Sequence, residues 1–273
     1  MRSAFPRVLV ACALASLFAH TPEADAKTAA KTDRLMVFAA ASLTESFGEL
    51  GARLEKSHPG LEVRFSFAGS QQLEAQLEQG ARADVFASAD DRWMSVAAEH
   101  RLLAGDPQVF AHNRLIVIVP RTNPARIDRL QDLAHRGVKL VLAAQTVPAG
   151  EYGRQLLANL ARAPGYPADF ATRTLANVVS EEDNVRSVVS KVQLGEADAG
   201  ICYVSDATGP VARHVRVFTI PEGLNVLATY PIAALAGAAD TDAARAFIDL
   251  VFSPEGQAVL ARHAFLPAKA PGD

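Results

Sequence analysis

Cysteine, excess positive charge and long apolar runs are all scarce in this sequence. Two cysteines, Cys12 and Cys202, exclude a framework of several disulfide bonds. Lysine and arginine total 27 against 30 acidic residues, and the formal net charge of −3 excludes the basic footprint of a nucleic-acid-binding protein. The longest apolar run, Val8 to Ala19, is too short for a membrane-spanning helix, which needs about 20 residues. A globular chain remains, and its 49% of hydrophobic residues can form a sizeable core.

The first 26 residues have the pattern of a secretory signal peptide. Arg2 and Arg7 precede the apolar run, and Ala24-Asp25-Ala26 supplies a small-x-small cleavage site. We therefore expect export to the periplasm, with residues 1–26 removed and Cys202 left as a lone structural thiol in a buried strand. The segment that ends at Cys12 also resembles a lipoprotein box, but too few apolar residues separate Arg7 from Cys12 for lipidation to be the favoured interpretation.

From residue 35 onward, short apolar segments alternate with segments whose apolar residues recur at helical spacing. Residues 185–192, for example, place four valines on one helix face. Strands are predicted at residues 35–40, 61–67, 84–88, 115–120, 140–143, 199–203, 215–218 and 226–235. Repeated βαβ spacing of this kind predicts an α/β fold with mainly parallel sheets.

Polar residues mark several of the predicted helix starts. Ser42 with Glu45 three residues later forms a capping-box pattern. Asp90 or Asp91 can cap the helix that follows residues 84–88, and Ser253 precedes a proline at the first position of the last helix.

The alternation is interrupted by residues 115–120 and then starts again, which indicates a second lobe. The extended segment 226–235 returns the chain to the first lobe, where two terminal helices follow. We assign residues 27–113 and 228–273 to lobe 1 and residues 114–227 to lobe 2, so two hinge strands join the lobes. Ligands of open α/β sheets bind outside the carboxyl ends of the strands, so the site is expected between the lobes.

Several strand-to-helix turns carry small or hydroxyl residues and no conspicuous charge, namely at Ser42, Ser70 and Ala149. The first N–H groups of a helix lack internal partners and carry the positive end of the helix dipole. Converging turns of this kind would form an anion site without lysine or arginine. A serine at a helix start is also an ordinary cap, so these residues by themselves leave plain capping open.

At these turns the sequence resembles the periplasmic molybdate-binding proteins of ABC transporters. The resemblance covers nearly the whole chain after the signal peptide, and its motifs together are highly specific. They are residues 39–44 (AAASLT), 67–70 (FAGS), 80–90 (GARADVFASAD), 147–152 (VPAGEY), 184–186 (NVR) and 200–207 (GICYVSDA).

The resemblance implies a two-lobed periplasmic-binding-protein fold of type II and a site that holds the oxyanion through hydroxyls and backbone amides. Motif by motif, those roles fall on Ser42, Ser70, Ala149, Val185 and Tyr203. It further implies a monomer that captures molybdate, and tungstate as well, and delivers it to the membrane permease of an ABC importer. Molybdenum would then enter only as the oxyanion, and neither a cofactor nor a catalytic residue is expected.

The five positions suit a fully deprotonated dianion, because none of them is acidic. Hydrogen phosphate retains a proton near neutral pH and needs an acceptor, which such a site does not offer. Sulfate has the same charge as molybdate, and the difference in size cannot be read from the residues. A binding protein for sulfate or another oxyanion is therefore the alternative, and molybdate is preferred on the resemblance.

Three other classes of function are less well supported. Ser42 and Ser70 lack the Gly-x-Ser-x-Gly context of a hydrolase nucleophile. A sensory domain of the same fold does not fit the signal peptide. The seven histidines match no metal-ligand spacing, and four of them are expected at the surface or in turns, namely His58, His100, His112 and His135. The acidic runs at residues 90–91 and 181–183 are interpreted as helix-start residues.

Overall fold

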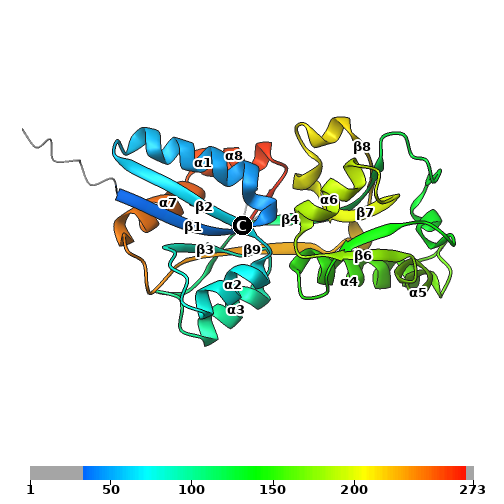
Figure 1. Ribbon diagram of the computed structural model, residues 1–273, viewed down its shortest axis with the longest axis horizontal. Helices are drawn as coiled ribbons and strands as arrows, with labels where there is room; N and C mark the ends of the chain where they lie inside the picture. The colour runs from blue at the N-terminus through cyan, green and yellow to red at the C-terminus, as the bar shows by residue number, and fades with distance from the viewer. Residues whose placement is uncertain (1–32, 269–273) are drawn as a thin grey trace, which may run out of the picture. The chain divides into compact units, whose positions relative to one another are not determined.

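The computed structural model describes residues 33–268, so the predicted signal peptide lies outside the described residues. Strands and helices alternate along this range (Figure 1). The strands are β1 (Asp33–Ala40), β2 (Leu61–Ala68), β3 (Val85–Ala87), β4 (Gln108–Pro120), β5 (Leu140–Ala143), β6 (Val178–Glu182), β7 (Ala199–Tyr203), β8 (Val215–Thr219), β9 (Leu227–Ala234) and β10 (Leu266–Pro267).

The helices lie between these strands and after them. The α-helices are α1 (Thr44–Ser57), α2 (Ser70–Glu78), α3 (Asp91–Glu99), α4 (Pro148–Arg162), α5 (Phe170–Leu175), α6 (Val185–Gln193), α7 (Thr241–Phe252) and α8 (Pro254–Arg262). Short 3-10 helices are η1 (Ala41–Leu43), η2 (Leu130–Ala134), η3 (Val204–Ala207), η4 (Val211–Arg213) and η5 (Glu222–Leu224). Within residues 33–268, none of these helices has both the length and the apolar composition that crossing a membrane requires.

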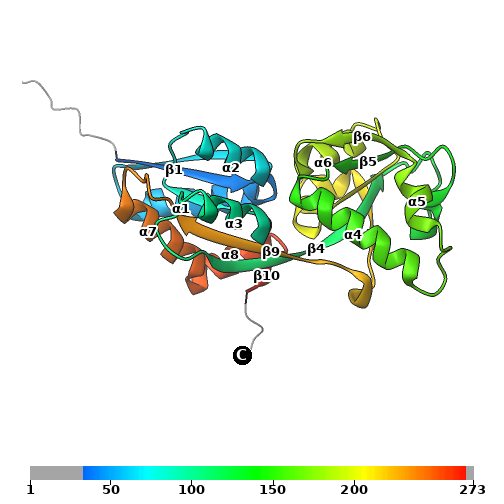
Figure 2. The same ribbon diagram turned by 90° about the horizontal axis from the view of Figure 1, so that it is seen from below.

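The strands form two groups that share β4. In one group β1 pairs in parallel with β2 and with β3, and in the other β5 pairs in parallel with β6 and with β7. Strand β4 joins them, because its residues 108–114 pair with β9 and its residues 115–120 pair with β7 and β8. Two lobes result, with β4 running from one to the other (Figure 2).

The two-lobed α/β fold that the sequence predicts is confirmed, with one refinement. The strands of the β/α alternation pair in parallel, as expected. The strands that cross or return between the lobes pair antiparallel: β9 with β3 and β4, and β4 with β7 and β8. Antiparallel neighbours need no helical crossover between them, so these segments lack the βαβ signal that predicts parallel pairing. The residue limits assigned to the lobes stay a prediction.

Helices cover both faces of the sheet that contains β1, β2 and β3. Helices α1, α7 and α8 lie on one face and α2 and α3 on the other (Figure 1). Strand β1 alternates accordingly, because Val37 belongs to the core shared with Phe47 of α1, whereas Phe38 packs with Leu73 of α2 and Met94 of α3. In the second lobe the four valines of α6 are buried, as their spacing predicts. These packed layers hold the strand ends and helix starts in fixed positions.

The predicted caps of α3 and α8 are confirmed. Asp90 accepts from the N–H of Trp93, and Ser253 accepts from the N–H of Gly256, with a proline at the first position of α8. Cys202 is buried in β7 as expected, and this burial raises the pKa of its thiol well above the ordinary value.

The interpretation of residues 181–183 as helix-start acids is wrong. Glu181 and Glu182 lie in β6, which extends this far because it pairs with β5. Glu182 forms an ion pair with Lys191, with 2.6 Å between the carboxylate oxygen and Nζ, and Asn184 is the residue that caps α6. His112 also differs from the expectation, since it is a half-buried residue within β4 rather than a turn residue.

Candidate functional site

A small pocket lies where the carboxyl ends of β1 and β2 meet the starts of α4 and α6. Its lining comes from both lobes and comprises Ala40, Ala41, Ser42, Ala68, Gly69, Ser70, Ala89, Val147, Pro148, Ala149, Asn184, Val185 and Tyr203. All five site residues predicted from the sequence are among them. Within residues 33–268, no charged side chain lines this pocket. Its cavity volume is about 10 Å³, whereas pockets for organic ligands measure roughly 300 to 1,000 Å³. The pocket therefore suits a small ion.

Ser42 lies in η1, directly after β1, and is 4% exposed. The predicted capping box with Glu45 is wrong, because α1 begins at Thr44 and the Ser42 hydroxyl instead lies 2.9 Å from the hydroxyl of Tyr230. The short 3-10 turn shifts the start of α1 past Ser42. This shift leaves the serine on the pocket wall rather than on the helix end.

Ser70 is the first residue of α2 and is 1% exposed. Its oxygen accepts from the N–H of Ala89 at 3.0 Å, so its own proton remains available to a second acceptor. The preceding Gly69 lies against the other lobe, where a Cβ would come within 2.4 Å of the Asp183 carbonyl oxygen. A glycine is therefore required for this close approach between the lobes.

The starts of α4 and α6 point backbone donors at the pocket from lobe 2. Proline at the first position of α4 has no N–H, so Ala149 is the first residue there that can donate. In α6 the side chain of Asn184 caps the N–H of Ser187, which leaves the N–H of Val185 as an uncapped first-turn donor. Both donors belong to the backbone, and for this reason the side chains at these two positions carry little information.

Tyr203 ends β7 and is 1% exposed. Its hydroxyl has no hydrogen-bond partner within the part of the chain that the structure describes. Burial raises the pKa of the phenol well above its ordinary value, so the group keeps its proton and can act as a donor. A buried hydroxyl without a partner costs free energy, and a bound acceptor would remove that cost.

Two buried acids lie behind the pocket wall. Asp206, in η3, accepts from the N–H of Tyr203 at 2.9 Å, and burial raises the pKa of its carboxyl to about 7. Asp90, the cap of α3, has its pKa raised to about 6, again by burial. Both groups hold protons more readily than ordinary carboxylates, because burial disfavours their charged forms.

Polar contacts at the surface between the lobes connect them around the pocket. The guanidinium of Arg186 donates to both carboxylate oxygens of Glu45, at 2.5 and 2.6 Å. Two further contacts end on backbone carbonyls: Gln71 Nε2 donates to Asp183 at 2.8 Å, and Trp93 Nε1 donates to Thr146 at 2.8 Å. These contacts hold the pocket closed in this conformation.

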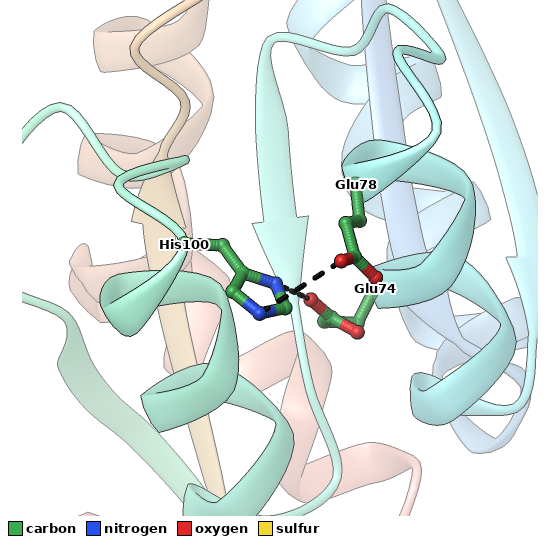
Figure 3. A group of neighbouring side chains, drawn as sticks. All are labelled: Glu74, Glu78 and His100. Carbon is green, nitrogen blue, oxygen red and sulfur yellow. Dashed lines mark hydrogen bonds and ion pairs between the residues drawn. The ribbon is translucent and has the colours of Figure 1, made fainter.

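A cluster of Glu74, Glu78 and His100 lies away from the pocket, between α2 and the end of α3 (Figure 3). Carboxylates and imidazole are the side chains that bind zinc. Here, however, each ring nitrogen of His100 faces a carboxylate, with Nδ1 at 2.9 Å from Glu74 and Nε2 at 3.9 Å from Glu78. Glu74 is 3% exposed, so the imidazole is a polar partner for a buried carboxylate. We interpret the cluster as a structural link between α2 and α3.

Sequence analysis did not identify Tyr230, Asn113 and Asp206. Tyr230 lies in β9, within the predicted apolar segment 226–235, and Asn113 lies in the first half of β4, which the apolar pattern does not mark as a strand. Asp206 belongs to a motif that carries the family resemblance, but its burial behind Tyr203 becomes apparent in the structure. The side-chain partners of Tyr230 and Asn113, which are Ser42 and Ser205, are far away in the sequence, so no local pattern could have found these two contacts.

A small closed pocket between two α/β lobes is the arrangement of a solute-binding protein. The family model described as bacterial extracellular solute-binding protein matches residues 35–266. The molybdate-binding protein ModA of Mycobacterium tuberculosis strain H37Rv is 39% identical over 231 residues, which cover 85% of this chain and 84% of that protein. The chain therefore belongs to the molybdate-binding proteins of the bacterial extracellular solute-binding family.

Solved structures show the same fold. A periplasmic molybdate-binding protein from Azotobacter vinelandii has a TM-score of 0.72 at 20% identity, over 86% of this chain and 100% of that chain. The sulfate-binding protein SubI from Mycobacterium tuberculosis H37Rv has a TM-score of 0.75 at 19% identity, over 87% of this chain and 88% of that chain. At these identities the likeness concerns the fold alone, so the choice of anion depends on the sequence relatives.

Proposed function

We propose that this protein captures molybdate, and tungstate in the same way, in the pocket between its lobes and delivers it to the permease of an ABC importer. The observation that carries the proposal is the lining of the pocket, where uncharged donors from both lobes meet around a space for one small ion. The relatives' name supports molybdate as that ion. Family membership and the signal-peptide pattern support a periplasmic location, and a monomer that acts as a carrier rather than an enzyme.

The donor set explains why a dianion would be bound. Ser42, Ser70 and Tyr203 offer hydroxyl protons, and the helix starts at Ala149 and Val185 offer backbone N–H groups at the positive ends of helix dipoles. Hydrogen bonds to a charged ligand are stronger than those between neutral groups, and they strengthen further where water is excluded. Fixed, uncharged donors can therefore replace the hydration of the ion without a counter-charge.

Binding would also favour the closed arrangement of the lobes. Ser42 and Ser70 come from lobe 1, whereas Ala149, Val185 and Tyr203 come from lobe 2, so a complete donor set exists only when the lobes meet. A ligand that contacts both lobes shifts the population toward this state. The hinge would be the strands near residues 114–120 and 226–235, and the permease would then recognise the closed form. This closing movement is proposed together with the residue limits of the two lobes.

Titration calorimetry of the purified protein against molybdate, tungstate, sulfate and phosphate tests the proposal directly. We expect tight binding of molybdate and tungstate, much weaker binding of sulfate, and little binding of hydrogen phosphate, whose proton finds no acceptor on the pocket wall. Tighter binding of sulfate would favour the alternative, a sulfate-binding protein. Binding of none of the four anions would refute an oxyanion site.

A further inference from the structure

Tyr230 lies next to the pocket, although it is not among the lining residues found within positions 33–268. It is fully buried in β9, and its ring packs edge-on against Tyr203, with 5.9 Å between ring centroids. Its hydroxyl lies 2.9 Å from the hydroxyl of Ser42, and either oxygen can be the donor in this pair. The direction of this one hydrogen bond decides where the Ser42 proton points.

The neighbours of Tyr230 leave it able to act as the donor in this pair. Asn113 Oδ1 already accepts from the N–H of Arg114 at 2.9 Å, and one proton of Asn113 Nδ2 is donated to Ser205 Oγ at 2.8 Å. Burial raises the pKa of Tyr230 well above its ordinary value, so the phenol keeps its proton and can donate it to Ser42.

The proposed ligand determines the direction of the hydrogen bond between Tyr230 and Ser42. A fully deprotonated dianion only accepts hydrogen bonds, so the Ser42 hydroxyl must donate its single hydrogen bond to the ligand. Its oxygen can then only accept from Tyr230. The order of donation becomes Tyr230 to Ser42 and Ser42 to the anion.

We infer that Tyr230 is a positioning residue of the oxyanion site, whose hydroxyl donates to Ser42 and thereby aims the Ser42 proton into the pocket. This inference rests on the proposed function. It also explains why a tyrosine occupies this buried position, where phenylalanine would fill nearly the same volume.

A double-mutant cycle tests the inference, with molybdate affinity measured by titration calorimetry on Tyr230→Phe, Ser42→Ala and the double variant. Loss of the orienting hydrogen bond should weaken molybdate binding about ten-fold in Tyr230→Phe. In the Ser42→Ala background the same substitution should change affinity by less than about two-fold, because no hydroxyl remains to be aimed. The matched control is Tyr166→Phe, a partly buried tyrosine that packs against Phe170 in lobe 2, and it should bind as the wild type does.

Two further readouts separate positioning from packing. In Tyr230→Phe the Ser42 oxygen is free to accept, so the ratio of molybdate to hydrogen phosphate affinity at pH 7 should fall. Ser42→Ala removes the hydroxyl that pairs with the buried Tyr230 hydroxyl, so the Tm of this variant should be lower than that of the wild type. Adding Tyr230→Phe should recover part of the loss in Tm. A purely structural tyrosine would instead lower Tm further in the double variant.

The outcomes distinguish the two proposals. Absence of molybdate binding in the wild type overturns the proposed function and this inference together. If the wild type binds and Ser42→Ala weakens binding, the proposed function stands. In that case an unchanged affinity in Tyr230→Phe, or an equal loss in both backgrounds, overturns the inference alone.

Discussion

Replacing Tyr203 by phenylalanine removes one oxygen from the pocket wall and leaves the ring in place. In the proposed complex this hydroxyl donates to the anion, and a hydrogen bond to a charged partner contributes about 1.5 to 3 kcal/mol. Tyr203→Phe should therefore weaken molybdate binding about 10- to 150-fold. The hydroxyl is buried without a partner in the described residues, so its removal should leave the Tm measured without oxyanion unchanged or raise it. Affinity and ligand-free stability should thus move in opposite directions.

The assay pairs titration calorimetry with thermal unfolding in the absence of oxyanion, and Tyr166→Phe serves as the control for loss of a phenol elsewhere in lobe 2. An affinity within two-fold of the wild type would refute the role of Tyr203 as a donor. A parallel loss of affinity and of Tm would show instead that the hydroxyl has a structural partner, and the assignment of the pocket would need revision.

Three further predictions concern the surroundings of the pocket. Burial raises the pKa of Asp206 from 3.8 to about 7, so the folded state holds a proton that the unfolded chain has released, and stability falls as the pH rises from about 4 to about 7. The Tm advantage of Asp206→Asn over the wild type should therefore be larger at pH 8 than at pH 5, and an equal difference at both would contradict the assigned shift. Gly150→Ala should destabilise the start of α4, because a Cβ there would lie 2.0 Å from the Ala144 carbonyl oxygen, and a wild-type Tm would exclude the clash. Arg186→Gln breaks a half-exposed ion pair with Glu45 and should speed molybdate release by at most about five-fold in stopped-flow measurements, with Glu45→Gln as the reciprocal test.

Most of the fold was predictable, because buried parallel strands are continuous apolar runs and amphipathic helices have a clear period. The secondary-structure elements that were not predicted lack these signals. The first half of β4 contains His112 and Asn113, so its apolar run is visible only from Leu115 onward. The six-residue helix α5 is too short to show a helical period. The antiparallel pairing of β9 is a tertiary property that no local pattern specifies.

The candidate site was predictable to a different degree. The five pocket residues were assigned from motif resemblance, and the structure brings all five together, while their contacts with an oxyanion stay a prediction. Physical chemistry of the sequence predicted uncharged helix starts but not their convergence. The contact between Ser42 and Tyr230 joins residues 188 positions apart, and the capping-box pattern at Ser42 even indicated a different partner. Long-range pairs of this kind are fixed by how the strands pack.

The uncharged lining of the pocket has a consequence for the electrostatics of the whole complex. No side chain on the wall carries a counter-charge within the described residues, so the charge of a bound dianion would stay unpaired locally. The formal net charge would change from −3 to −5, since molybdate contributes −2. Loaded and empty carrier would then differ in electrophoretic mobility, and the loaded carrier would present a more negative field at long range. Low ionic strength would enlarge this difference, so the surface that meets a transporter is affected by the cargo even where no residue moves.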